Sequence, residues 1–328
     1  MTRHRRYPRL LALLVTVTVL FVPCSLTAFQ YPSLTISSGT TTGSYYAAAS
    51  AIAKVFNPSS GRNGVRLATV ASPGSVANID QVADGKAAFG IAETELLKRA
   101  TLGVRPWEGK ARTGLRAIFS IYVESVTVVA AVDSGIKRVS DLKGKRLNIG
   151  APGSIDNTYA AAFLQMSGLN PGLVVTSQHS TAIAPELLQK GEIDAYLCIV
   201  GHPNLTVLEA SAGKRKVTLI SLDNALIQQV VGHNPLLMAV AIPTNFYPRV
   251  EVSGKVPTIG LRAVLFTSAD QPEEIVYAVV REVMSNLDLF RRQHPILQNL
   301  SPRDAAKVGA IALHPGALRY FKEAGLVP

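Results

Sequence analysis

Apolar residues recur in two alternating rhythms along most of the 328-residue chain. Segments with apolar positions three and four residues apart predict helices at residues 44–56, 157–166, 272–286 and 302–313, and further helices that start at residue 75 and end near residue 190. Short runs rich in β-branched residues predict strands at residues 34–36, 65–71, 87–92, 115–122, 126–132, 147–150, 174–177, 194–200 and 259–267. Strands that alternate with helices favour an α/β fold with largely parallel sheets.

The same unit, a strand followed by a glycine turn and a helix, opens two successive sets of elements, near residues 36 and 147. This repetition predicts two lobes of similar build. We expect lobe I to combine residues 29–122 with residues 236–328, and lobe II to hold residues 123–235. The connections at Tyr122–Val126 and Val231–Leu237 would then form a hinge that closes the lobes over a ligand.

Three turns of small residues, at residues 38–44, 72–75 and 151–158, each lead into a predicted helix. Glycine lets a backbone approach a ligand closely, and the free N–H groups of a first helical turn hold anions. Each turn alone is better explained as a tight connection, but three in corresponding positions predict a carboxylate or phosphate cleft beyond the strand ends. We predict that the cleft is lined by Ser38, Gly39, Thr40, Thr41, Thr42, Tyr45, Gly74, Ser75, Asn78, Glu93, Ser154, Asn157 and Thr158, with Tyr122 or Glu124 as a further contact from the hinge.

Composition narrows the classes of function. Hydrophobic residues make up 48% of the chain and charged residues 17%, which excludes a disordered protein. The net charge of +11 comes from scattered basic residues without interleaved aromatics, so we predict no nucleic-acid partner. The six histidines lack metal-ligand spacing and the common hydrolase and phosphate-loop motifs are missing, so we predict no catalytic residue and no metal ligand. Because a lone histidine is more often structural than functional, we expect His202 to have a structural role.

The first 28 residues have the pattern of a cleavable secretory signal peptide. Arginines at residues 3–9 precede an apolar run at residues 10–22, Pro23 ends the run, and Ala28 supplies a small residue at the cleavage point. Cleavage would remove Cys24 and leave Cys198, in an apolar run, as a buried structural thiol. We therefore expect a periplasmic or otherwise extracytoplasmic protein without a membrane span, and a monomer.

The ordered motifs of the chain resemble those of the TAXI-type solute receptors of tripartite ATP-independent periplasmic (TRAP) transporters. The resemblance covers nearly all of the expected mature chain and rests on a Gly/Thr-rich loop before a Tyr-Tyr helix at residues 36–46, Gly-Ser-x-x-Asn at residues 74–78, Asp-Leu-Lys-Gly-Lys-Arg at residues 141–146, an Ala-Pro-Gly-Ser turn at residues 151–154, Gly-x-Ile-Asp-Ala at residues 191–195 and the ending at residues 314–325.

The resemblance implies a two-lobed, type II-like periplasmic-binding-protein fold without a cofactor, and a TRAP membrane permease subunit as partner. It also implies a glutamate-like, glutamine-like or related organic-acid ligand. The chain departs from the family pattern at Asp156, which follows Gly153-Ser154-Ile155, and at Glu93-Thr94-Glu95. These acidic residues argue against a simple dicarboxylate and leave room for an amine-bearing or neutral ligand. An exported receptor for a signalling system and an exported enzyme remain the alternative functions.

Overall fold

A computed structural model describes residues 31–41, 43–152, 154–252 and 254–328, and Tyr31–Pro328 form one unit. The predicted signal peptide, Cys24 and Thr42 lie outside the described residues. Within the described ranges, the helices are all too short or too polar to cross a membrane.

The strands of these ranges form one mixed sheet in the order β2-β1-β3-β10-β4-β7-β5-β6, with β8 beside β4 and β9 beside β10. The strands are β1 (Ser33–Ser37), β2 (Arg66–Val70), β3 (Phe89–Glu93), β4 (Leu115–Ala131), β5 (Arg146–Asn148), β6 (Val175–Ser177), β7 (Ala195–Val200), β8 (Val217–Leu219), β9 (Met238–Pro243) and β10 (Lys255–Ser268).

The prediction of an α/β fold is confirmed, but the expectation of largely parallel sheets is wrong at the centre. β1 pairs in parallel with β2 and β3, and β5 pairs in parallel with β6 and β7. Between these two parallel ends, β3–β10, β10–β4 and β4–β7 are all antiparallel. The return of β10 from the last third of the chain into the middle of the sheet creates this antiparallel centre.

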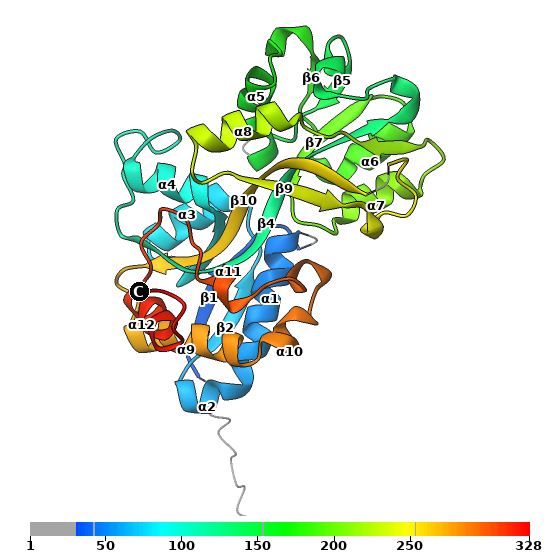
Figure 1. Cartoon of the computed structure of the whole chain (residues 1–328). Helices are drawn as coiled ribbons and strands as arrows, with labels where there is room; N and C mark the ends of the chain where they lie inside the picture. Colours follow the sequence, from blue (N-terminus) through cyan, green and yellow to red (C-terminus); the bar gives the residue numbers. More distant parts are fainter. Residues whose placement is uncertain (1–30, 42, 153, 253) are drawn as a thin grey trace, which may run out of the picture. The chain divides into compact units, whose positions relative to one another are not determined.

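Helices cover both ends of the sheet. They are α1 (Ser44–Phe56), α2 (Ser60–Asn63), α3 (Ser75–Ala83), α4 (Thr94–Leu102), α5 (Ile155–Met166), α6 (Ala184–Gln189), α7 (Leu205–Ala212), α8 (Asn224–His233), α9 (Glu273–Ser285), α10 (Leu287–Arg291), α11 (Pro302–Ala305) and α12 (Pro315–Glu323). Figure 1 shows α1, α9 and α10 near β1 and β2, and α5, α6 and α7 near β5, β6 and β7.

The strongest helical patterns were predicted well, because they bury one continuous apolar face. The expected helix at residues 44–56 is α1, which buries Tyr45, Ala48, Ile52 and Val55 as the spacing predicts. The expected helix at residues 302–313 is wrong, since α11 ends at Ala305 and Gly309 adopts a left-handed φ of 68°. The chain becomes helical again only in α12.

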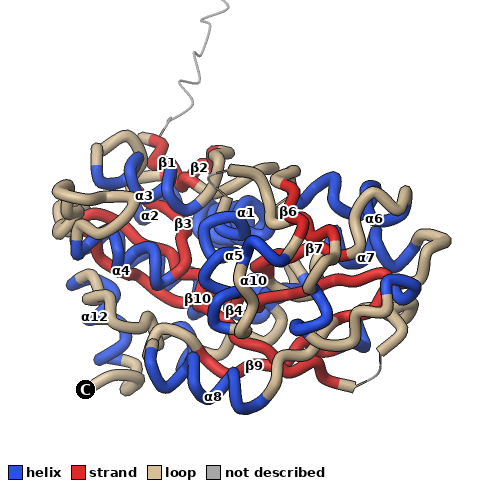
Figure 2. Tube along the Cα trace, turned by 90° about the horizontal axis from the view of Figure 1, so that it is seen from above, coloured by secondary structure: helices blue, strands red, loops and turns tan. Residues whose placement is uncertain are grey.

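β4 and β10 are long neighbouring strands at the centre of the sheet, as Figure 2 shows from above, and they contact elements of both parallel ends. The two strands predicted at residues 115–122 and 126–132 are therefore one continuous strand. Two hydrophobic clusters pack on the first part of β4, up to Tyr122, and two others pack from Val126 onward. On β10 the same change falls between Leu261 and Ala263.

The predicted lobe boundaries remain a prediction, and this packing bears on where they would fall. The change on β4 coincides with the expected hinge at Tyr122–Val126. Residues 242–259, assigned to lobe I from the sequence, pack with the second set of clusters instead. The packing therefore favours a second crossing point at Leu261–Ala263 rather than at Val231–Leu237.

Candidate functional site

The first two glycine turns lie against each other. The Ser38 amide and hydroxyl both donate to the carbonyl of Val70, at 3.0 and 2.8 Å, and the Ser72 amide donates to the Gly39 carbonyl at 3.0 Å. β1 and β2 are parallel neighbours, so their carboxyl ends bring these turns together. Ser38 and Gly39 are buried, whereas Thr40 and Thr41 are exposed on the same turn.

Asn78 lies beneath these two turns and is fully buried. Its Oδ1 accepts hydrogen bonds from the hydroxyls of Ser37 and Ser72, and its Nδ2 donates to the carbonyls of Ser38 and Ile91. All four hydrogen-bonding positions of the amide are thus used inside the protein. In this conformation Asn78 holds the turns in place, and its amide is not free for the ligand contact that the sequence predicts.

Tyr45 joins the first two helix starts to β4. Its hydroxyl donates to Oε2 of Glu124 on β4 at 2.9 Å and lies 3.1 Å from the Ser75 hydroxyl at the start of α3. All three side chains are buried. Gly74, with φ of 126°, precedes Ser75 in a conformation that L side chains rarely adopt. The structure therefore brings the predicted residues Tyr45 and Ser75 together, and the Tyr45 hydroxyl links Ser75 to the Glu124 carboxyl group.

Glu93 forms a second buried carboxyl site at the end of β3. Its side chain caps α4 by accepting from the amides of Glu95 at 2.6 Å and Leu96 at 2.9 Å. It also accepts from the Tyr159 hydroxyl of α5 at 2.8 Å. Glu93 thus ties the start of α4 to the first turns of α5, which belong to opposite ends of the sheet.

The third helix start carries the last group of predicted residues. Ser154 caps α5 by accepting from the Asn157 amide at 3.1 Å, Asn157 Nδ2 donates to the Gly150 carbonyl, and the exposed Thr158 hydroxyl donates to the Ser154 carbonyl. These side chains shape the helix start. Asp156 beside them is buried and accepts from the Thr181 hydroxyl and, at 2.7 Å, from the Ile199 amide.

Glu93, Glu124 and Asp156 are three buried carboxyl groups, and the charges of Glu93 and Asp156 act on Glu124. Burial is the largest cause that raises the pKa of Glu124 to about 8, and the negative charges of Glu93 and Asp156 raise it further. Burial likewise raises the pKa of Glu93 to about 7 and that of Asp156 to about 6. A ligand that brings a positive charge or hydrogen-bond donors would stabilise the ionised forms of these three groups.

Sequence reasoning placed Glu124 only as a possible hinge contact and did not select Tyr159. The hydrogen bonds that define their roles join residues 79 and 66 positions apart in the chain, and no local pattern encodes such a pairing. Tyr159 could be predicted from the sequence by its position alone, because it lies on the first turns of α5, one residue after the predicted Thr158. Tyr122 is buried near Ser44, and its hydroxyl lacks a well-formed hydrogen bond.

Two further sequence predictions concern single residues outside this network. Cys198 is a fully buried free thiol, as predicted, and burial raises its pKa well above the ordinary value. His202 contacts the hydroxyls of Tyr247 and Thr127 through its two ring nitrogens, and burial lowers its pKa to about 4. Both residues therefore serve the packing around β7. In the ranges that the structure describes, His, Cys, Asp and Glu form no cluster able to hold a metal ion.

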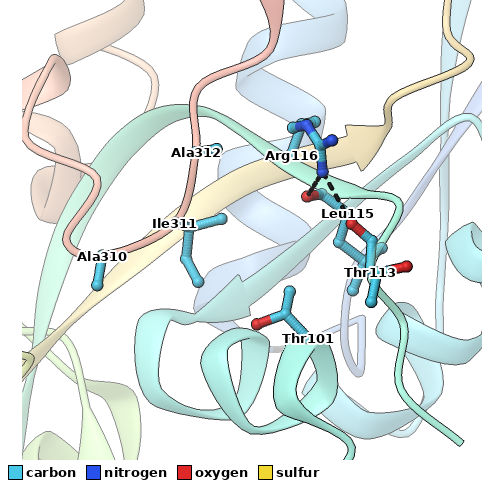
Figure 3. A pocket seen from close by; sticks show the side chains of 7 residues that line it. All are labelled: Thr101, Thr113, Leu115, Arg116, Ala310, Ile311 and Ala312. Atoms are coloured by element: carbon cyan, nitrogen blue, oxygen red, sulfur yellow. Dashed lines mark hydrogen bonds between the residues drawn. The ribbon is translucent and has the colours of Figure 1, made fainter.

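An open pocket of about 270 Å³ lies between the end of α4, the start of β4 and residues 310–312. Figure 3 shows Arg116 at its edge, where Nη1 donates to the carbonyls of Thr113 and Leu115 at 2.9 and 2.8 Å. The guanidinium is thus directed at backbone groups. The pocket shares no residue with the predicted cleft and offers no carboxyl group.

Residues 36–325 match the NMT1-like family over nearly the whole described chain. The protein belongs to the NMT1-like family. The narrower assignment to TAXI-type receptors of TRAP transporters stays a prediction for this NMT1-like chain.

Several solved structures are similar to this chain. One, described as an alkanesulfonate-binding protein from Xanthomonas axonopodis pv. citri bound to MOPS, is 15% identical, with 92% of this chain and 96% of that chain covered and a TM-score of 0.47. A sulfonate-binding protein from Methylobacillus flagellatus is 14% identical (91% and 88% covered, TM-score 0.46). An L-cystine ABC transporter protein from Listeria monocytogenes is 11% identical (85% and 99% covered, TM-score 0.49).

Proposed function

We propose that this NMT1-like protein is an extracytoplasmic receptor that captures a small amino acid and delivers it to a membrane importer. The proposal rests on the position of the Tyr45 hydroxyl, which lies within hydrogen-bonding distance of both the Ser75 hydroxyl and the Glu124 carboxyl. This contact joins two glycine-turn helix starts to a buried acidic group at the point where the core packing changes along β4.

The chemistry of the site favours a ligand that carries both charges. The carboxyl groups of Glu93, Glu124 and Asp156 would accept hydrogen bonds from an ammonium group, and ionisation of the three groups would become more favourable in its presence. The exposed hydroxyls of Thr40 and Thr41, close to the start of α1, would receive the carboxylate. A glutamate-like or glutamine-like amino acid satisfies both requirements, whereas a simple dicarboxylate satisfies only one.

The proposed receptor works by closure of two lobes. β4 and β10 both cross the boundary between the two sets of core clusters, so they would serve as the hinge. The hydrogen bond from Tyr159 to Glu93 joins the two sides of that boundary and would belong to the closed form. Export by the predicted signal peptide at residues 1–28 would place this receptor outside the cytoplasmic membrane.

Calorimetric titration of the purified protein with a panel of amino acids and organic acids tests the ligand class. We expect an amino acid to bind and the matched dicarboxylate that lacks the amine to bind at least tenfold more weakly. Glu124→Gln and Ser75→Ala should each weaken binding at least tenfold, while the exposed controls Glu192→Gln and Ser140→Ala should bind as the parent does. Parent-like binding by both site variants would place the ligand elsewhere.

The membrane partner is tested separately. The TAXI resemblance favours a TRAP membrane permease subunit, and we expect the ligand-loaded protein to retain that subunit from detergent-solubilised membranes. An ABC-type permease is the alternative partner, and retention of an ABC permease would replace the TRAP assignment. Retention of a sensor kinase would instead identify a signalling receptor, and chemical conversion of the bound amino acid would identify an enzyme.

A further inference from the structure

A second, mostly apolar pocket of about 160 Å³ lies between α4, α5 and α8, and it borders the candidate site at Tyr159, which bonds Glu93. Its lining includes the side chains of three central strands, namely Val126 of β4, Leu197 and Ile199 of β7, and Ile259 and Leu261 of β10. All five residues are buried. Among the residues predicted to line the amino-acid cleft, none lines this pocket.

The size and lining of the pocket favour a compact apolar group. A cavity of roughly 150 Å³ lined by aliphatic and aromatic side chains takes up benzene in an engineered protein, so this volume suits a single six-membered ring. Small-molecule sites are usually lined by apolar residues, with a few polar groups that fix orientation. The buried aromatic ring of Phe163, from α5, adds to the apolar lining.

The rim of the pocket carries a small number of charged and polar groups. Arg99 of α4 is paired through Nε with Glu95 Oε1 at 3.3 Å, and its guanidinium lies 5.6 Å from the centre of the Tyr159 ring. In the described part of the chain, the two Nη groups of Arg99 make no hydrogen bond. His233 of α8 contacts the Gln229 carbonyl through Nδ1 at 2.7 Å, so Nδ1 acts as a donor.

Met166 and Ala162 complete the lining on α5, and both are exposed. An exposed methionine next to an apolar pocket is a flexible, polarisable contact that adapts to an incoming ring. The pocket is therefore open where α5 meets solvent and closed by buried strand residues at its other side.

We propose that this pocket is a second binding site, which takes a compact apolar acid of about one six-membered ring with its anionic group against the Nη groups of Arg99. The strand residues enclose the ring, and the guanidinium receives the acid. The pocket is lined by α4 from one side of the sheet boundary and by α5 and α8 from the other, so an occupant contacts both sides.

Benzoate is the probe, and Met166 is the reporter. The chain has only four methionines, so a ¹³C-methyl-methionine spectrum resolves Met166 from the buried Met284 and from Met238. We expect benzoate to shift the Met166 signal saturably at millimolar concentration. Benzylamine, which carries the opposite charge, should bind at least tenfold more weakly than benzoate.

Matched variants separate this pocket from a general effect on the protein. Ala162→Trp places a large ring at the opening and should abolish the benzoate shift, while Ala161→Trp, at the exposed neighbour outside the pocket, should retain it. Arg99→Gln should weaken benzoate at least tenfold and leave toluene unchanged, whereas the exposed control Arg292→Gln should change neither.

Two outcomes would overturn the second site. One is the absence of a saturable Met166 shift in the folded parent, and the other is an equal shift in Ala162→Trp and the parent. The outcome is independent of the amino-acid receptor function, because Glu124→Gln should lose amino-acid binding and keep the benzoate shift. Ala162→Trp should show the reverse pattern.

Discussion

The Tyr159 hydroxyl donates a hydrogen bond to Glu93 at 2.8 Å and so connects α5 to the carboxyl group that caps α4. This contact joins helices from the two parallel ends of the sheet. It is also the second-largest influence on the pKa of Glu93, which it lowers against the larger effect of burial.

Tyr159→Phe removes this donor and keeps the ring. We expect a loss of unfolding free energy of about 1–3 kcal/mol, because a buried acceptor loses one of its partners. The pKa of Glu93 should rise further above its value of about 7. Chemical denaturation measures the first effect, and carboxyl-selective NMR titration measures the second. Tyr46→Phe, at a partly exposed tyrosine of the same chain, is the control and should change neither quantity.

The raised pKa of Glu124 makes stability depend on pH. The folded protein holds a proton on Glu124 up to a pH of about 8, whereas the ordinary pKa is 4.5, so the folded state binds more protons than the unfolded state between these values. The contribution of Glu124 to the unfolding free energy therefore falls as the pH rises from 4.5 to 8. Glu124→Gln should remove that fall. The melting temperature of the variant should therefore rise relative to that of the parent between pH 5 and pH 8.5.

A constant difference in melting temperature across this range would contradict the buried, protonated state of Glu124. Glu192→Gln at an exposed position provides the baseline, and its difference from the parent should not change with pH.

Asn78 should be critical for stability rather than for ligand contact. Asn78→Ala removes four buried hydrogen bonds, two to the Ser38 and Ile91 carbonyls and two from the Ser37 and Ser72 hydroxyls, so we expect a loss of about 2–4 kcal/mol. Asn78→Asp should be at least as damaging, because an acceptor would then face two carbonyls. Denaturant titration checks both, and the exposed Asn299→Ala should lie within about 0.5 kcal/mol of the parent. A parent-like Asn78→Ala would mean that the turns are held by other contacts.

Gly260 allows β10 to pass close to β4 beside Glu124. A Cβ at this position would lie 2.6 Å from Val123 Cγ1 and 3.0 Å from the Glu124 carbonyl. We expect Gly260→Ala to cost about 1–3 kcal/mol of unfolding free energy, because the backbone must move apart. The matched control is Gly114→Ala, where a Cβ would meet nothing within 4 Å. Equal thermal stability of the two variants would disprove the close approach.

The sequence predicted the elements better than their partners. Helix starts at Ser44 and Ser75 follow from local spacing and turn residues, and the structure places them as expected. The antiparallel centre does not follow from any local signal, because the apolar pattern of β10 is the same whichever strands flank it. The acidic centre of the candidate site was missed in part for the same reason, since Glu124 meets Tyr45 only after distant strands have assembled.

The position of β10 also affects how the chain matures during its own synthesis. β10 lies between β3 and β4, yet it is made more than 120 residues after β4 ends. A nascent chain that has been translated only to residue 254 leaves the facing edges of β3 and β4 unpaired and open to other strands. Neither set of core clusters is complete in such a chain, so the ribosome must deliver residues 255–328 before folding can finish.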